Sequence, residues 1–195
     1  MKKLILLAMA VGAMFVYAIP TSASAATLLT TSTGGSPTSV TVTQDPSNVV
    51  QISTPLGVTT CEAIDFGIDV TKNTETEAKG NGTSGKFSTK GCLAGGLVPI
   101  EITNIEVSSI SFTNKTVGSA TLLFTEDIPA LGLSDCNLHG TVGLAYAHKT
   151  NTVTITSPNA LTGGGGSASC PTSGTIKGSF ILEETSSPFN PITFS

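Results

Sequence analysis

Four cysteines have the widest choice of chemistry in this 195-residue chain, since a thiol can bind a metal, act as a nucleophile or form a disulfide. Cys61, Cys92, Cys136 and Cys170 stand singly, without the Cys-x-x-Cys spacing that is typical of zinc sites. A reactive thiol would need an unpaired cysteine beside an activating base. Disulfides are therefore favoured. Of the three pairings that four cysteines allow, the similar intervals of 31 and 34 residues favour Cys61–Cys92 and Cys136–Cys170.

Histidine is the usual general base near neutral pH, and this chain has two. His139 and His148 flank one expected strand nine positions apart, and an odd separation places two side chains on opposite faces of a strand. No Gly-x-Ser-x-Gly motif is present to position a nucleophilic serine. The pattern favours surface histidines, and no catalytic residue is predicted.

The acidic side chains form three pairs by spacing: Asp65 with Asp69, Glu126 with Asp127, and Glu183 with Glu184. Such pairs can carry out glycosidic acid–base chemistry or bind calcium. More often they form the solvated face of an edge strand, where charge discourages aggregation. The chain has no Trp to stack on a sugar ring and no EF-hand pattern, so a glycosidase is disfavoured. Neither a metal site nor a cofactor is predicted.

Four consecutive glycines, residues 163–166, raise the question of a phosphate-binding loop. No Gly-Lys-Ser/Thr follows them at the spacing of such a loop, and no helix is expected to begin there. The ordinary interpretation is a flexible connection between two strands.

Alternation of apolar and polar residues recurs along the chain, whereas helical spacing is almost missing. It predicts about nine or ten short strands, for which the candidates are residues 39–43, 49–54, 63–70, 98–107, 110–114, 119–126, 140–148, 152–157 and 175–184. Short strands separated by Gly, Asn, Pro and Ser are typical of an antiparallel β-sandwich. A faint echo between the segments that begin at Leu56 and Leu131 is compatible with two related halves packed face to face.

The N-terminus has the layout of a secretory signal peptide. Two lysines precede an apolar stretch from Leu4 to Ile19, and Ala23-Ser24-Ala25 predicts cleavage after Ala25. No later segment has the roughly 20 apolar residues that span a bilayer, so no transmembrane segment is expected after cleavage. The expected organisation is a signal peptide over 1–25, an extended segment over 26–56 that packs on or leads into the domain, and a β-sandwich domain over 57–195.

Composition argues against nucleic acids, phosphate ligands and anionic bilayers as partners. All nine basic residues are lysines, and without residues 1–25 the chain has seven lysines against thirteen acids, a formal charge of −6. Nucleic-acid and phosphate recognition usually requires basic patches and arginine forks, and anionic bilayers attract basic segments. Serine and threonine together number 53, which is typical of strands with hydroxyl-lined faces in extracellular proteins.

Four stretches, "LLTTS" (28–32), "TPLGVTTC" (54–61), "GTVGLAY" (140–146) and "CPTSGTIKGSFIL" (170–182), together resemble a family of small secreted bacterial β proteins. These are the PraB-like activators of alkane oxidation and their uncharacterised actinobacterial relatives. The resemblance implies a non-enzymatic surface or extracellular protein that acts at hydrophobic interfaces or in hydrocarbon utilisation. It implies no catalytic residue.

Two other functions stay open. A self-associating structural or adhesive subunit could donate residues 26–44 as a strand to a neighbouring copy, with Gly34 and Gly35 as the hinge. A hydrolase or carbohydrate-binding module would use Asp65, Asp69 and the histidines. The expected partner is a cell surface, a matrix or a hydrophobic interface, in a secreted protein that would be periplasmic if the host has an outer membrane.

Overall fold

A computed structural model describes residues 27–147, 149–185 and 187–194, which form an all-β protein. The expected signal peptide, residues 1–25, and His148 lie outside the described residues. Within them, the helical structure is one short turn, η1 (Pro129–Leu131), and no helix there is long and apolar enough to cross a membrane.

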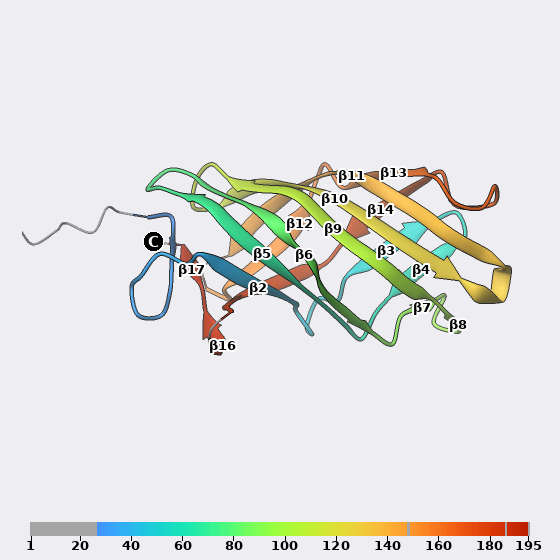
Figure 1. Cartoon of the computed structure of the whole chain (residues 1–195), viewed down its shortest axis with the longest axis horizontal. Coiled ribbons are helices and arrows are strands. Elements are labelled where there is room, and N and C mark those ends of the chain that lie inside the picture. Colours follow the sequence, from blue (N-terminus) through green and yellow to red (C-terminus); the bar gives the residue numbers. More distant parts are fainter. Residues whose placement is uncertain (1–26, 148, 186, 195) are drawn as a thin grey trace, which may run out of the picture.

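Eight antiparallel strands close into a barrel (Figure 1). Around the barrel the order is β10-β9-β6-β5-β2-β15-β12-β11, and β11 pairs with β10 to complete the circle. The strands are β2 (Ser39–Gln44), β5 (Ala63–Asn73), β6 (Ala78–Lys90), β9 (Glu101–Phe112), β10 (Val117–Ile128), β11 (Leu133–Ala147), β12 (Thr152–Thr156) and β15 (Ser179–Glu184).

The prediction of a sandwich was therefore wrong, although the all-β class was right. Alternation shows that each strand has one buried face, but it does not show whether the buried faces meet across two sheets or around one closed sheet. Strand β10 pairs with β9 along residues 118–127 and with β11 along residues 117–128, and this decides in favour of closure.

Strand β10 illustrates how the sequence pattern forms the barrel wall. Ala120, Leu122 and Phe124 point inward and are buried, while the residues between them are only partly buried. On the outer face, the Thr121 and Thr141 hydroxyl oxygens lie 3.1 Å apart across β10 and β11. Apolar side chains thus fill the barrel, and threonines supply cross-strand hydrogen bonds on its outside.

Strand β11 also supports an extension at one end of the barrel. Residues 143–147 pair with β12, whereas residues 137–139 pair with β13, so the sheet divides along this strand. The extension continues in the order β13-β14-β3-β4-β7-β8. Its strands are β13 (Ala160–Gly164), β14 (Ser173–Lys177), β3 (Gln51–Thr54), β4 (Gly57–Thr60), β7 (Leu93–Ala94) and β8 (Val98–Pro99).

The opposite end of the barrel carries the chain termini of the described region. Strand β1 (Leu29–Thr30) pairs with β17 (Thr193–Phe194) in a separate two-stranded sheet, and β16 (Ser187–Pro191) pairs with β15. Figure 1 shows β17 at one end of the elongated molecule and β7 and β8 at the other.

Both predicted disulfides are present, Cys61–Cys92 and Cys136–Cys170. Cys61 follows β4 and Cys92 precedes β7, so the first disulfide lies within the extension. The second disulfide joins Cys136, in the part of β11 that carries the extension, to Cys170, which lies between β13 and β14. Two disulfides are typical of an oxidising, extracellular or periplasmic setting.

The segment over residues 26–56 contributes to both parts of the sheet. Strand β2 is a wall of the barrel, paired with β5 and β15, and β3 belongs to the extension. The faint internal echo does not mark two halves packed face to face. After Leu56 the chain turns at Cys61 between β4 and β5, whereas after Leu131 it runs through Cys136 within the single strand β11.

Three of the four glycines, at 163, 165 and 166, pack tightly rather than forming a loose connection. Gly163 lies in β13, its amide donates to the Thr172 carbonyl at 2.8 Å, and a Cβ at this position would lie 1.9 Å from the Pro171 carbonyl oxygen. Gly166 has a φ of +73°, and a Cβ there would meet the Asp135 carbonyl oxygen at 2.4 Å. Glycine is required because two backbone segments approach too closely for any side chain.

We predict that Gly163→Ala destabilises the protein by about 1–3 kcal/mol or more, since the methyl group forces β13 away from residues 171–172. Gly164→Ala is the matched control, because its Cβ would meet only the His139 ring, at 3.8 Å. Urea unfolding of both variants measures the difference. Equal losses at the two positions would contradict the close approach.

Candidate functional site

The barrel interior holds an apolar cavity at its centre. Its volume is about 30 Å³. The lining side chains are Val42, Phe66, Ile105, Val107, Ile110, Ala120, Leu122, Phe124, Leu144, Val153, Ile155, Phe180 and Leu182, all of them hydrocarbon. A void of this kind offers a water molecule no hydrogen-bond partner, so we expect it to be dry.

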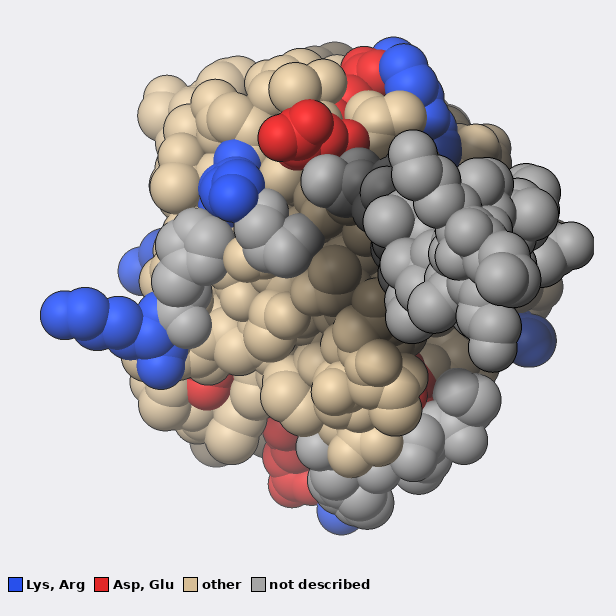
Figure 2. Space-filling view, turned by 90° about the vertical axis from the view of Figure 1, so that its left-hand side faces the viewer, with Lys and Arg blue, Asp and Glu red and all other residues tan. Residues whose placement is uncertain are grey.

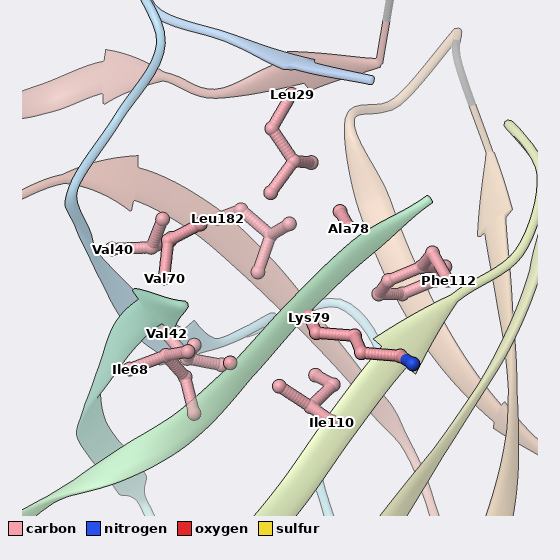
Figure 3. A pocket seen from close by; sticks show the side chains of 11 residues that line it. Leu29, Val40, Val42, Ile68, Val70, Ala78, Lys79, Ile110, Phe112 and Leu182 are labelled. Carbon is pink, nitrogen blue, oxygen red and sulfur yellow. The ribbon is translucent and has the colours of Figure 1, made fainter. Parts of the chain in front are cut away.

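A second apolar cavity, also of about 30 Å³, lies nearer the chain termini (Figure 3). It is lined by Leu29, Val40, Val42, Ile68, Val70, Ala78, Lys79, Gly80, Ile110, Phe112 and Leu182. The Lys79 ammonium group does not face an apolar void unpaired, since it forms an ion pair with Glu77 at 2.7 Å.

The two cavities are successive along the barrel. On β5 the outer one contacts Ile68 and Val70 and the central one contacts Phe66; on β9 they contact Phe112 and Ile105 respectively. Each therefore occupies a different level of the same strands.

Val42, Ile110 and Leu182 line both cavities. These three side chains form the partition between them. We call the two cavities and their partition together the lumen.

Residues 27–32, which include β1, and residues 192–194, which include β17, form a lid over the outer cavity. Leu28 and Ile192 are fully buried in it, and Leu29 reaches the cavity itself (Figure 3). The Phe194 ring packs against Phe112, with ring centroids 4.8 Å apart, and against Tyr146 at 4.0 Å. The lid is thus built from apolar side chains on its inner face.

Polar contacts fasten the lid to the barrel. The Leu29 amide donates to Asn73 Oδ1 at 2.9 Å, and Asn73 Nδ2 donates to the Leu29 carbonyl at 2.8 Å. The Ser32 amide and hydroxyl both donate to Glu184 Oε1, at 2.7 and 2.9 Å. Because Asn73 satisfies both backbone groups of Leu29, it substitutes for a neighbouring strand at this edge.

Figure 2 shows the lid end of the molecule from outside. Among the atoms that are not grey, the centre of this face is uncharged and hollowed, and the lysine and acidic side chains lie toward its rim. An apolar molecule approaching the lid would therefore meet no charged group at the centre of the described surface.

Asp65 and Asp69 lie on the outer face of β5, in a shallow groove of about 270 Å³. Four residues along a strand separate their Cα atoms by about 13 Å, more than the roughly 5–9.5 Å that paired glycosidase carboxyl groups require. Asp65 Oδ2 accepts a 3.3 Å hydrogen bond from Ser88, and Oδ1 is buried without a partner among the described residues. Among the described residues the one histidine, His139, is exposed on β11, which is not a neighbour of β5 in the barrel.

In each of the other two acidic pairs, the two residues are adjacent in sequence and lie on opposite faces of their strand. Glu184 is buried and holds Ser32 of the lid segment, whereas Glu183 is only partly buried. Asp127 accepts a hydrogen bond from the Asp135 amide at 2.7 Å. Among the described residues, no group of three or more His, Cys, Asp or Glu side chains is placed to hold a metal ion.

Glu126, which the sequence identified only as half of an acidic pair, is a buried carboxyl group. It points inward from β10 beside the fully buried Cys136, and its Oε2 atom has no hydrogen-bond partner among the described residues. Burial raises the pKa of the Glu126 carboxyl above its ordinary value, because the charged form loses its hydration.

We predict that Glu126→Gln raises the free energy of unfolding at pH 7, by about 1.4 kcal/mol for each unit that burial adds to the Glu126 pKa, because a neutral amide avoids the cost of burying a carboxylate. A raised pKa in the folded protein means that Glu126 favours folding most at low pH, and that this contribution is lost as pH rises from the unfolded pKa through the folded one. The difference in the free energy of unfolding between variant and parent should therefore widen from pH 4 to pH 8.

Thermal unfolding across this pH range measures this difference. Asp127→Asn, on the opposite face of β10, is the matched control and should show no such widening. A stability difference that narrows as pH rises would contradict the raised pKa of Glu126 in the folded protein.

A larger cleft, of about 430 Å³, lies between β6 and β9 beyond their pairing at residues 78–80, and it shares Phe66, Ile105 and Val107 with the central cavity. Its lining includes the exposed side chains of Ser84, Lys86 and Ser108. Water can satisfy these polar groups. The lining of this cleft therefore does not point to one class of ligand, whereas the lining of the lumen does.

The chain matches no known family, no curated protein and no solved structure. The resemblance to the PraB-like proteins therefore stays a prediction, and the fold and site described above rest on this chain alone.

Proposed function

We propose that this protein is a secreted binding protein that takes a small aliphatic molecule into the barrel lumen. The observation that carries the proposal is the pair of successive apolar cavities, divided by Val42, Ile110 and Leu182 and covered by a lid. Eight-stranded barrels either fill their interior with side chains or hold one small ligand. The resemblance to proteins of alkane oxidation supports the same ligand class.

The closed lumen is smaller than its proposed ligand. Each void of about 30 Å³ is far below the roughly 150 Å³ of a cavity that binds benzene. Binding therefore requires the partition side chains to rotate and the lid to yield. A linear chain suits this route better than a ring, because the interior of an eight-stranded barrel is only about as wide as the side chains that fill it.

The lid is the element that must move. Its backbone is held at Leu29 by Asn73 and at Ser32 by Glu184, and β1 and β17 are only two residues long each. Short strands with few hydrogen bonds open at a lower free energy than the barrel wall. The same contacts hold residues 27–32 within the chain, so strand donation to another copy would require the lid to leave its place.

Thermal unfolding of the chain from residue 26 onward, with n-octane and with 1,8-octanediol, tests the proposal. A ligand that binds only the folded state raises the unfolding temperature. n-Octane should raise it, and the diol should not, because the lumen has no partner for its hydroxyl groups. Asn73→Ala should accelerate n-octane binding by loosening the lid. The absence of any shift with n-alkanes from pentane to decane, in a folded protein, would contradict it.

A further inference from the structure

Exposed leucines gather at the end of the molecule opposite the lid. The described chain has five large hydrophobic residues with substantial exposure, Leu56 (44%), Val58 (40%), Leu97 (86%), Val117 (54%) and Leu131 (56%). Four of them belong to the turns and short strands of the extension or to η1, and Val117, at the start of β10, is the exception. We call Leu56, Val58, Leu97 and Leu131 the apolar tip.

Backbone contacts bring the elements of the apolar tip together. The Gly95 amide donates to the Val58 carbonyl at 2.9 Å, and the Leu97 amide donates to the Ala94 carbonyl at 3.1 Å, which places the β7–β8 turn against β4. Strand β8 also lies beside η1, which carries Leu131. Figure 1 shows β4, β7 and β8 at the end of the molecule away from β17. The tip is therefore one surface made from three separate turns.

The charges near the tip are mainly negative. Glu101 and Asp127 face each other across β9 and β10, next to β8 and η1, and Asp135 lies beside Asp127. Glu62 follows β4 and forms an ion pair with Lys90 at 3.5 Å. Carboxylates around an apolar surface repel anionic membranes. The apolar tip is therefore compatible with uncharged surfaces.

The size of the apolar tip favours a fluid surface over a protein as its binding partner. Four partly exposed aliphatic side chains present an apolar area on the order of a few hundred Å², whereas a stable protein interface buries about 800 Å² on each partner. The tip is thus too small for a stable dimer. Leucines on protruding turns can instead insert into an oil phase, where shape complementarity is not required.

We propose that the apolar tip attaches the protein to an uncharged oil surface. Leu97 and Leu131 enter the oil phase, and the surrounding carboxylates stay in water. This attachment site is at the opposite end from the lid and does not depend on the lumen holding a ligand.

Adsorption to n-hexadecane droplets in water, measured by depletion of the chain from solution, tests the proposal. Leu97→Ser with Leu131→Ser should weaken adsorption at least tenfold, since each buried leucine favours transfer by more than a factor of ten. Val117→Ser, of similar exposure at the other end, is the matched control and should adsorb like the parent. All three substitutions are at exposed positions, and equal unfolding temperatures check that the fold is retained.

Two further measurements complete the test. Size-exclusion chromatography should give the same elution volume for parent and variants, and vesicles of phosphatidylserine should not bind the chain. Equal adsorption of the Leu97/Leu131 variant and the Val117 variant would overturn the proposal. So would a parent oligomer that the tip substitutions dissociate, or preferential binding to phosphatidylserine.

Discussion

Leu182→Ala is expected to lower the free energy of unfolding by about 2–5 kcal/mol, and saturating n-octane is expected to restore part of that loss. Leu182 is buried in the partition and lines both cavities, so its truncation leaves a void and joins the two levels of the lumen. A ligand at a hundredfold excess over its Kd stabilises the folded state by about 2.7 kcal/mol. Urea unfolding with and without n-octane measures both effects.

Leu123→Ala is the matched control for this prediction. Leu123 lies on the outer face of the same barrel, opposite Glu106 and His139 on the neighbouring strands. Its truncation should cost less stability, and n-octane should stabilise this variant no more than it stabilises the parent. Equal rescue of both variants would place the bound alkane outside the lumen.

Removal of the Cys136–Cys170 disulfide by Cys136→Ala with Cys170→Ala is expected to cost about 2–5 kcal/mol. The extension should lose most of this stability, because its strands have only two to five residues and both disulfides hold them. Amide hydrogen exchange should therefore accelerate in β13 and β14 while the barrel strands β9 and β10 stay protected.

The Cys61→Ala with Cys92→Ala variant provides the comparison, since its loop is of nearly the same length, 31 residues against 34. It should lose a similar free energy, with faster exchange in β4 and β7 instead. Uniform acceleration across the barrel in either variant would contradict a local role for the disulfides.

Local sequence patterns predicted most of the barrel strands but not their arrangement, and they missed β6, whose sequence AKGNGTSGKFSTK shows no apolar alternation. Alternation over residues 119–126 identified the strand β10, and the cysteine spacing identified both disulfides. Closure depends on which strands pair, as when Ala120 meets both Val142 and Ile110, and alternation does not specify the partner of a strand. The sandwich was therefore predicted from a pattern that a barrel shares.

The candidate site was harder to predict because distant residues build it. Leu29 is held by Asn73, 44 residues away, and its strand pairs with residues 193–194 at the other end of the chain. Neither contact leaves a local signal. Glu126 was visible as half of an acidic pair, but its burial follows from its inward position in β10, which the neighbouring apolar residues at 122, 124 and 128 could have indicated.

The most direct test of the central claim is an NMR measurement of contacts between n-octane and ¹³C-labelled methyl groups of the folded chain. If the lumen is the binding site, intermolecular NOEs will reach the partition methyl groups of Val42, Ile110 and Leu182 and will persist in Leu97→Ser. NOEs confined to Leu97 and Leu131, or none in a sample that retains its fold, would contradict the account.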